Sequence, residues 1–486
     1  MSAYRFPQSL RETIRSALPA DTSLHGEKPL AEHLYLPAVH AKALNPNNML
    51  VQGIRGSGKS FWCATLQSDK LRGLLGRTAG MPAECVVTIG FSERPSGGGF
   101  PSKDTLSKLL DDGRDPRRIW QTVIFQQVMG EQAPAEFVAL SGWGARIEWL
   151  ASHPEQLEKY LYECDQSLQQ QGKMHLVLFD ALDRSADDWH KMNALLRGLL
   201  RMVLEFRPYQ ALRLKVFVRP DQLEDAAVTS FPDASKVMAQ KVTLEWLRRD
   251  LYGLLWQYLA NAKKGGEQFR EGVIECVPGI TWQKDDEAWH VPEKMRAEES
   301  IQRQVFHAIT GPWMGRDKRR GLPYSWLPNH LADSRSEVSP RSFLAALREA
   351  AEDSPHAQQE TALHFESIKR GVQEASRIRV HEIEEDYPWI RTLLVPLRGV
   401  SVPVEMDDIL QKWKAAGSLA ALKQGINAES VRLPPLHIHE GPDGVLDDLV
   451  SLGLMERLKD GRINLPDVYR VGYGLRRKGG LKPVKS

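Results

Sequence analysis

Eight consecutive residues, Gly53 to Ser60 (GIRGSGKS), have the residue types and the spacing that bind phosphate. The glycines allow a tight turn in which successive backbone N–H groups converge on anionic oxygens. The pattern G-x-x-x-x-G-K-[ST] places its lysine on the β- and γ-phosphates of a nucleotide and its last hydroxyl on Mg²⁺. The sequence therefore predicts an ATP-binding phosphate loop with Ser60 as a metal ligand. Its expected binding residues are Gly53, Arg55, Gly56, Ser57, Gly58, Lys59 and Ser60.

Two aspartates follow the apolar run 174–179, which is predicted to be a buried parallel strand. In open α/β sheets, ligands bind at the carboxyl ends of the strands, where Asp180 would emerge. We expect Asp180 to hold Mg²⁺ through water, and Asp183 to position or activate the attacking water. A strand-end aspartate can instead cap the next helix. The phosphate loop upstream favours the metal role.

Three further residues are candidates for catalysis. Arg219 follows the predicted strand 212–218. It is interpreted either as a sensor of the γ-phosphate or as a surface arginine. Glu93, beyond the predicted strand 84–91, is the reserve candidate if Asp183 is not catalytic. Arg341 is expected in the first turn of a helix over 343–351, because Pro340 suits a first helical position and Ser339 suits a cap. From there Arg341 could reach a nucleotide.

A parallel sheet with flanking helices is needed to hold these residues together. Apolar runs predict its strands at 48–52, 84–91, 174–179, 212–218 and 237–243. Helical spacing predicts helices at 61–75, 105–110, 119–129, 154–170, 195–203 and 246–260. In the last of these, one face is expected to carry Leu247, Leu251, Leu254, Leu255 and Leu259. Residues 263–299 are polar and irregular, which predicts an insertion or an exposed loop.

The C-terminal part combines predicted helices with a hairpin. Ile409 and Trp413 lie on one helix, Val445 to Val450 lie on another, and Lys459-Asp460-Gly461 is a turn signal between two short strands. Helices followed by a small hairpin predict a winged helix. The segment 470–486 then contains six lysines or arginines and no acid. Such a tail is either simply solvated or a nucleic-acid contact.

Composition limits the classes of function. With 486 residues the chain should contain several domains. A net charge of +2 argues against the whole chain being an electrostatic nucleic-acid binder. No apolar run reaches the length of a membrane span, and four scattered cysteines match no zinc spacing. We therefore expect no membrane partner and a cytoplasmic protein.

The order of these features resembles the STAND group, signal-transduction ATPases with numerous domains, within the broad AAA+ and origin-recognition-like ATPases. The run 180–183 (DALD) matches the group's strand-end motif residue for residue, but Arg184 stands where the group usually has a second acid. With that arginine the run is similar to the KAP-type P-loop NTPases. Ser339-Pro340-Arg341 resembles the sensor arginine of the AAA+ lid domain, which implies that Arg341 meets the γ-phosphate. The likeness is close over residues 50–260 and only architectural elsewhere.

This resemblance implies an α/β fold with an ASCE-type P-loop sheet, a helical lid domain and a C-terminal winged helix. The expected segments are an N-terminal helical extension (1–45), the ATPase core (46–262), an insertion plus lid (263–375), and a winged helix with a basic tail (376–486). STAND proteins usually carry a sensing repeat array or an effector domain. Neither end of this chain has room for one, so we expect sensor and effector to be separate proteins.

Two classes of function remain open. The first is an ATP-hydrolysing switch that self-associates and controls partner proteins. Such ATPases are common in prokaryotic multi-gene anti-phage systems, which suggests antiviral defence. The second is a DNA-binding ATPase of the loader or initiator kind, using the winged helix and tail. In a homo-oligomer a neighbouring subunit would supply a further arginine, and the basic run 316–320 is the first choice, although it could be only a solvated loop.

Overall fold

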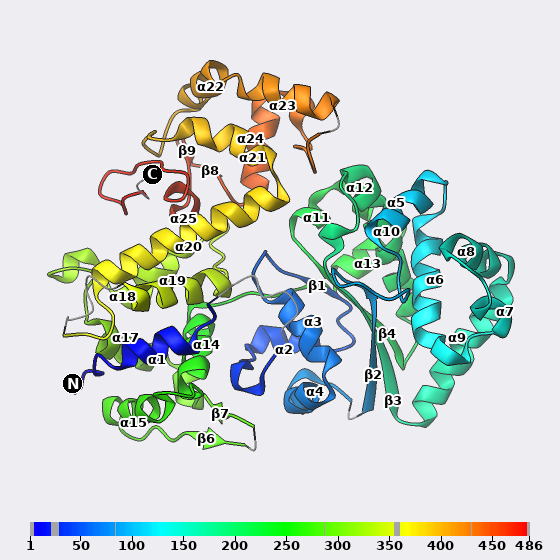
Figure 1. Ribbon diagram of the computed structural model, residues 1–486, viewed down its shortest axis with the longest axis horizontal. Coiled ribbons are helices and arrows are strands. Elements are labelled where there is room, and N and C mark those ends of the chain that lie inside the picture. The colour runs from blue at the N-terminus through cyan, green and yellow to red at the C-terminus, as the bar shows by residue number, and fades with distance from the viewer. Residues whose placement is uncertain are drawn as a thin grey trace. The chain divides into compact units, whose positions relative to one another are not determined.

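The computed structural model describes residues 4–20, 29–82, 84–285, 287–353, 360–428 and 430–483 (Figure 1). The chain divides into two compact units. The sheet unit contains residues 36–245. The helical unit contains residues 30–35, the N-terminal segment and the chain from Trp246 onward. This division differs from the four expected segments, because the helix after residue 246 and the N-terminal helix both belong to the helical unit.

A five-stranded sheet forms the centre of the sheet unit. Its strands are β1 (Leu50–Gln52), β2 (Glu84–Phe91), β3 (Lys173–Phe179), β4 (Leu212–Val218) and β5 (Val242–Thr243). Their spatial order is β2-β3-β4-β1-β5, and all neighbouring strands are parallel. The α/β fold with a parallel sheet is therefore confirmed. Because β1, β3 and β4 are neighbours in this order, the residues that follow them emerge together at one edge of the sheet.

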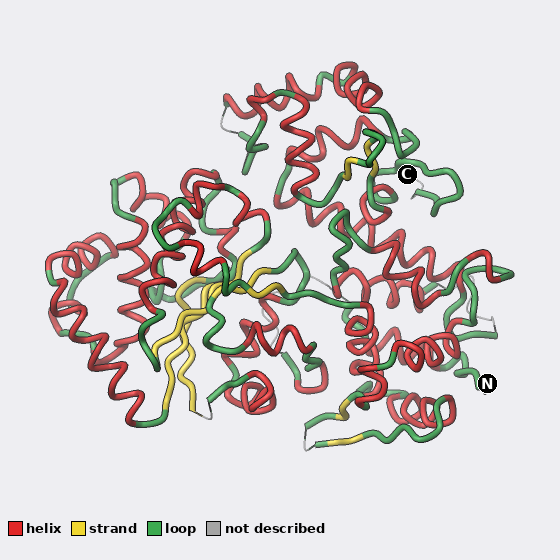
Figure 2. Tube along the Cα trace, turned by 180° about the vertical axis from the view of Figure 1, so that it is seen from behind, coloured by secondary structure: helices red, strands yellow, loops and turns green. Residues whose placement is uncertain are grey.

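Helices cover both faces of this sheet: α2, α3 and α4 lie on one side, and α6, α9 and α10 on the other (Figures 1 and 2). The helices of the unit are α2 (Ala38–Leu44), α3 (Lys59–Gln67), α4 (Asp69–Leu75), α5 (Lys103–Asp111), α6 (Pro116–Met129), α7 (Ala135–Val138), α8 (Trp143–Ser152), α9 (Pro154–Gln170), α10 (Trp189–Phe206), α11 (Asp221–Glu224), α12 (Ala226–Thr229) and α13 (Ala234–Met238). Apolar side chains of β3 and β4 pack against α6 and α10 in one buried cluster. This packing explains the apolar residues with which both strands face the cluster.

Two predicted elements of the sheet unit differ in the structure. The helix expected over 61–75 is interrupted at Ser68, which is extended and accepts a hydrogen bond from Leu71 N–H, so that it caps a separate helix, α4. Serine competes with helical hydrogen bonds in this way. The strand expected over 237–243 is only two residues long. Val237 instead lies in α13, where it is buried against the same core.

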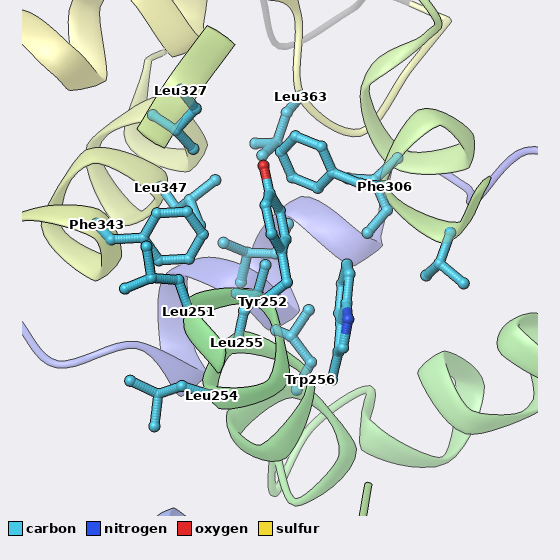
Figure 3. Close-up of a cluster of buried hydrophobic side chains, with 14 of the residues drawn as sticks. Leu251, Tyr252, Leu254, Leu255, Trp256, Phe306, Leu327, Phe343, Leu347 and Leu363 are labelled. Atoms are coloured by element: carbon cyan, nitrogen blue, oxygen red, sulfur yellow. The ribbon is translucent and has the colours of Figure 1, made fainter. Parts of the chain in front are cut away.

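A second hydrophobic core holds the helical unit together. Its elements before residue 390 are α1 (Leu10–Ala17), α14 (Arg248–Ala260), α15 (Gly266–Cys276), β6 (Gln283–Lys284), β7 (Trp289–His290), α16 (Glu293–Ala297), α17 (Glu299–Thr310), α18 (Pro323–Leu331), α19 (Pro340–Glu352) and α20 (Phe365–Asp386). Tyr252 of α14 lies between Phe306 and Phe343 in this core, and Trp256 stacks on Tyr252 (Figure 3). Leu251, Leu254, Leu255 and Leu259 are buried as predicted.

Three expectations for the helical unit are wrong. Leu247 is exposed, because it precedes α14 rather than lying on its buried face. The region 263–299 is not an irregular insertion: it forms α15, a hairpin and α16, and Phe269 and Val273 are fully buried. Ser339 stands at the N-cap position of α19 but makes no side-chain cap, although Pro340 does occupy the first turn.

The C-terminal part contains α21 (Trp389–Leu394), α22 (Met406–Ala415), α23 (Ser418–Asn427), α24 (Pro442–Ser451), β8 (Glu456–Arg457), β9 (Ile463–Asn464) and α25 (Asp467–Arg470). The predicted hairpin is present, because β8 and β9 pair in antiparallel fashion around the turn at Gly461. The winged helix as a named fold stays a prediction. None of the described helices combines the length and the hydrophobicity needed to cross a bilayer.

The basic C-terminal segment is not a free tail. Arg470 is fully buried and donates to Asp467 at 2.7 Å and to the carbonyl oxygens of Leu475 and Leu481. Arg477 also reaches Asp467, at 2.9 Å. The prediction missed this because the neutralising acid lies three residues before the segment whose charges were considered.

Candidate functional site

The phosphate loop connects β1 to α3 through two left-handed glycines. Gly56 has φ +80° and Gly58 has φ +99°, conformations that strongly favour glycine. Gly53 anchors the start of the loop, where its N–H donates to Val218 O at 3.1 Å. A Cβ atom on Gly53 would lie 2.3 Å from Ser57 Oγ and 3.3 Å from Leu244 Cβ. The backbone at Gly53, Gly56 and Gly58 therefore favours glycine, and Arg55 lies partly exposed in the loop.

Lys59 begins α3 and its side chain turns back into the loop. Its Nζ donates to Gly53 O at 2.7 Å and to Ile54 O at 3.0 Å. Loss of solvent around the ammonium group, together with the nearby Arg219 guanidinium, lowers the pKa of Lys59 to about 8, although Asp183 and Asp180 act in the opposite direction. Few water molecules can compete with a ligand for this ammonium group. An anionic ligand could replace the carbonyl oxygens of Gly53 and Ile54 as its hydrogen-bond acceptors.

Ser60 and Asp180 lie next to each other in the site. The Ser60 hydroxyl and the Ala181 N–H lie close enough to the Asp180 carboxylate to favour its charged form. Asp180 is buried at the end of β3, and this burial raises the pKa of its carboxyl above the usual value. A hydroxyl and a carboxylate side by side are hard oxygen donors, the ligand class that Mg²⁺ prefers. The two residues predicted to hold the metal thus lie together.

The turn after Asp180 has an unusual backbone. Ala181 adopts a left-handed conformation with φ +54° and ψ +35°, and it leads into a short 3-10 turn over Leu182–Arg184. A left-handed residue other than glycine costs free energy, and such residues cluster where a site fixes its side chains. The turn brings Asp183 back to the edge of the sheet at which Asp180 emerges.

A row of alternating charges lies at this edge of the sheet. It includes Asp183, Arg219 and Glu93. Arg219 Nη1 lies 3.6 Å from Asp183 Oδ2, and Arg219 Nε lies 3.7 Å from Asp221 Oδ1. On the other side of Asp183, Arg184 lies 3.8 Å from it and 3.8 Å from Glu93. This row of charges therefore crosses the ends of β2, β3 and β4, and it brings three of the four predicted catalytic residues together.

Sequence reasoning missed three members of this group. Asp221 and Gln222 fix the end of β4, because Gln222 Oε1 accepts the Arg219 N–H at 2.9 Å. Arg184 was noted only as a departure from a family pattern, whereas it stands between two acids. The position of Asp221 and Gln222 in the sequence could have revealed them. Both follow a strand whose last residue was predicted, so they lie at the same edge of the sheet.

The fourth predicted catalytic residue, Arg341, lies in the helical unit. It occupies the first turn of α19, and its Nη1 donates to Glu382 Oε1 at 2.6 Å. Glu382 is also paired with the buried Arg379, which reaches Tyr469. Arg341 is therefore held within a network of its own unit. The basic run over 316–320 is a largely exposed loop of the same unit.

Comparison with known proteins gives structural likeness only. No protein-family model matches the chain, and no curated protein matches it. A Walker-type ATPase of Pyrococcus abyssi is 14% identical over 92% of this chain and 97% of that chain, with a TM-score of 0.37. The ORC2 protein of Aeropyrum pernix, in ADPNP and ADP complexes, is 14% identical over 89% and 92%, with a TM-score of 0.38.

A third similar structure is Drosophila ORC bound to DNA, which is 13% identical over 96% of this chain and 99% of that chain, with a TM-score of 0.29. Likeness at these TM-scores is too weak to transfer a ligand, a partner or a residue role to this chain. The assignments that follow rest on its own residues.

Proposed function

We propose that this protein binds ATP with Mg²⁺ and hydrolyses it. One observation carries the proposal: the phosphate loop with Lys59, and the Ser60 hydroxyl beside the Asp180 carboxylate, occur at the same edge of one parallel sheet. Either feature alone is compatible with a structural turn. Together they supply an anion-binding backbone, a phosphate-facing cation and two metal-binding oxygens, which is what a nucleoside triphosphate requires.

Each residue has a distinct part in this proposal. The N–H groups of the loop and Lys59 bind the β- and γ-phosphates, and Lys59 exchanges its bonds to loop carbonyls for phosphate oxygens. Ser60 and Asp180 hold Mg²⁺, which would neutralise charge on the phosphate oxygens. Asp183 accepts a proton from the attacking water or orients it. Arg219 lies beside Asp183 and stabilises negative charge that develops on the transferred phosphoryl group.

Steady-state release of phosphate from MgATP tests the proposal. Wild-type protein should release phosphate, and Asp180→Asn should lose most of that activity because the metal loses its anionic ligand. Asp112→Asn is the matched control, since this exposed aspartate makes only a distant surface pair with Lys108. Equal rates for wild type and Asp180→Asn would contradict the metal assignment. Release of no phosphate by the wild type would contradict ATP hydrolysis.

We further propose that the ATPase acts as a switch in a homo-oligomer and controls a separate effector or sensor protein. Arg219 is already shared between Asp183 and Asp221, so a further cation is expected to come from a neighbouring subunit. The exposed run 316–320 is the candidate donor. Arg341 remains the candidate sensor from the helical unit, because breaking its pair with Glu382 would free a guanidinium for a phosphate.

The alternative role in DNA binding loses part of its support. Of the six cations in the C-terminal segment, Arg470 and Arg477 are engaged with Asp467. Arg476, Lys478 and Lys482 remain exposed, and Lys485 lies outside the described residues. Three exposed cations would give only a shallow dependence of DNA affinity on salt, of slope roughly −3 by counterion release. We therefore place the switch role first.

A further inference from the structure

The segment that closes the sheet unit lies directly against the phosphate loop. Leu244 N–H donates to Gln52 O, the residue before the loop, at 2.7 Å. The Cβ of Leu244 is one of the atoms that a side chain on Gly53 would meet. The next residue, Glu245, is the last of the sheet unit, and the chain continues into the helical unit at Trp246. We call residues 244–247 the connector.

His40 of α2 joins this connector to the helix that follows the loop. Trp62 Nε1 donates to His40 Nδ1 at 3.1 Å, and His40 Nε2 lies 3.0 Å from Glu245 O. An indole N–H can only donate, so Nδ1 must be the accepting nitrogen. Nε2 therefore carries the hydrogen and donates to the Glu245 carbonyl. Both ring nitrogens are used, and the histidine is fixed in one neutral tautomer.

Trp62 reaches the other end of the phosphate loop. Its backbone N–H donates to Gly58 O at 2.9 Å in the first turn of α3, and its indole lies 3.8 Å from where a Cβ on Gly58 would be. Lys59, Ser60 and Phe61 are the intervening residues. Hydrogen bonds thus run from Gly58 through Trp62, His40 and Glu245, and Leu244 closes the path at Gln52. Hydrogen bonds therefore hold both ends of the phosphate loop, and His40 connects the bonds at one end to those at the other.

Two features make His40 a rigid link. It is completely buried, and burial lowers its pKa to about 3, so the ring stays neutral at physiological pH. The helix that carries it is fixed to the sheet by Lys215 of β4, whose Nζ donates to Ala43 O, Asn45 O and Asn48 O. These bonds restrain the end of α2 that follows His40.

We propose that His40 is a positioning residue that couples the occupancy of the phosphate loop to the connector between the two units. Binding of phosphates draws Lys59 away from the loop carbonyls and moves the first turn of α3. Trp62 passes this movement through His40 to the Glu245 carbonyl. The inference rests on the proposed nucleotide site and adds the path by which that site acts on the rest of the chain.

Hydrogen exchange with and without MgADP, combined with ADP titration, tests this path. In wild-type protein ADP should change the exchange of amides in residues 244–247 as well as in the phosphate loop. His40→Phe removes both nitrogens and keeps a planar ring. We expect its ADP dissociation constant to rise about five- to tenfold, as for loss of buried hydrogen bonds. At saturating ADP, the loop amides and the Leu244 amide, which bonds Gln52 O directly, should still respond, and the amides of residues 245–247 should not.

A second variant and a control keep the test decisive. Trp62→Phe removes only the indole donor and leaves the His40–Glu245 bond, so it should also uncouple the connector even if His40→Phe fails to fold. His190→Phe changes an exposed histidine on α10 and should behave as wild type. A response of residues 245–247 that survives in Trp62→Phe or His40→Phe would overturn the inference while leaving ATP binding intact. Failure of the wild type to bind ADP would overturn the proposed function and the inference together.

Discussion

Arg219 Nη1 lies 3.6 Å from Asp183 Oδ2, so the ends of β4 and β3 are linked by opposite charges. Arg184 lies on the other side of Asp183, at 3.8 Å. Two cations beside one carboxylate restrict its rotation. A carboxylate held in one orientation at this edge is placed to accept a proton from water.

The first prediction concerns this carboxylate. Asp183→Asn should bind MgATP with nearly wild-type affinity and lose hydrolysis by about a hundredfold or more, the range for removal of a general base. Single-turnover phosphate release and nucleotide titration measure the two quantities separately. Asp187→Asn, four residues away and exposed in a pair with Lys103, is the control. Wild-type hydrolysis by Asp183→Asn would transfer the role to Glu93 or to a neighbouring subunit.

The second prediction concerns self-association. If a neighbouring subunit supplies an arginine, specific ATPase activity should rise with protein concentration, by up to about 10³-fold or more on assembly. Replacing Arg319 or Arg320 by alanine should flatten this rise and spare nucleotide binding. Light scattering on the same samples reports the assembly state. Constant specific activity of a monomer over a wide concentration range would count against the proposed oligomer.

The third prediction concerns the buried ion pair of the C-terminal segment. Arg470→Met should lower the free energy of unfolding of the helical unit by about 1–3 kcal/mol, because Asp467 and the carbonyl oxygens of Leu475 and Leu481 lose a buried donor, while Arg477 still pairs with Asp467. Arg476→Met removes a charge of the same sign at an exposed position and should have little effect. Urea unfolding of both variants measures the difference. Equal stability of the two variants would show that the segment is dispensable for the fold.

The fourth prediction concerns pH. Burial lowers the pKa of His175 to about 4, below its ordinary value of 6.5, and its Nε2 lies 2.9 Å from Thr88 Oγ. The unfolded chain therefore binds a proton that the folded chain does not. The contribution of His175 to stability is complete above pH 6.5 and falls by about 1.4 kcal/mol per pH unit as the pH decreases towards 4.

His175→Gln keeps a hydrogen-bonding side chain and does not titrate. Urea unfolding at several pH values between 7.5 and 4.5 should show a shallower loss of stability for this variant than for wild type. Other buried histidines and carboxyls contribute equally to both proteins, so the difference in slope isolates position 175. Parallel slopes would contradict the burial of a neutral His175.

The strands of the sheet could be predicted from the sequence more accurately than the elements around the sheet. Strands β2 and β4 have the predicted bounds, because mainly apolar runs next to turns favour strands. The loop, Asp180 and Arg219 follow from the ends of β1, β3 and β4. Long-range packing was not predictable in this way. Asp467 lies only three residues before Arg470, but nothing local indicates that the pair is buried, that residues 266–276 pack into a core, or that Arg184 joins Asp183 to Glu93.

The central claim is that Lys59 and its loop bind the phosphates of ATP, and nucleotide titration of one pair of variants tests it most directly. Calorimetry with MgATP should give saturable binding to wild type and to Lys70→Ala, a variant at an exposed lysine of α4. Lys59→Ala should bind at least about tenfold more weakly, because it loses charge-assisted bonds to two phosphates, while its thermal unfolding stays cooperative. Wild-type affinity in a folded Lys59→Ala variant would contradict the site.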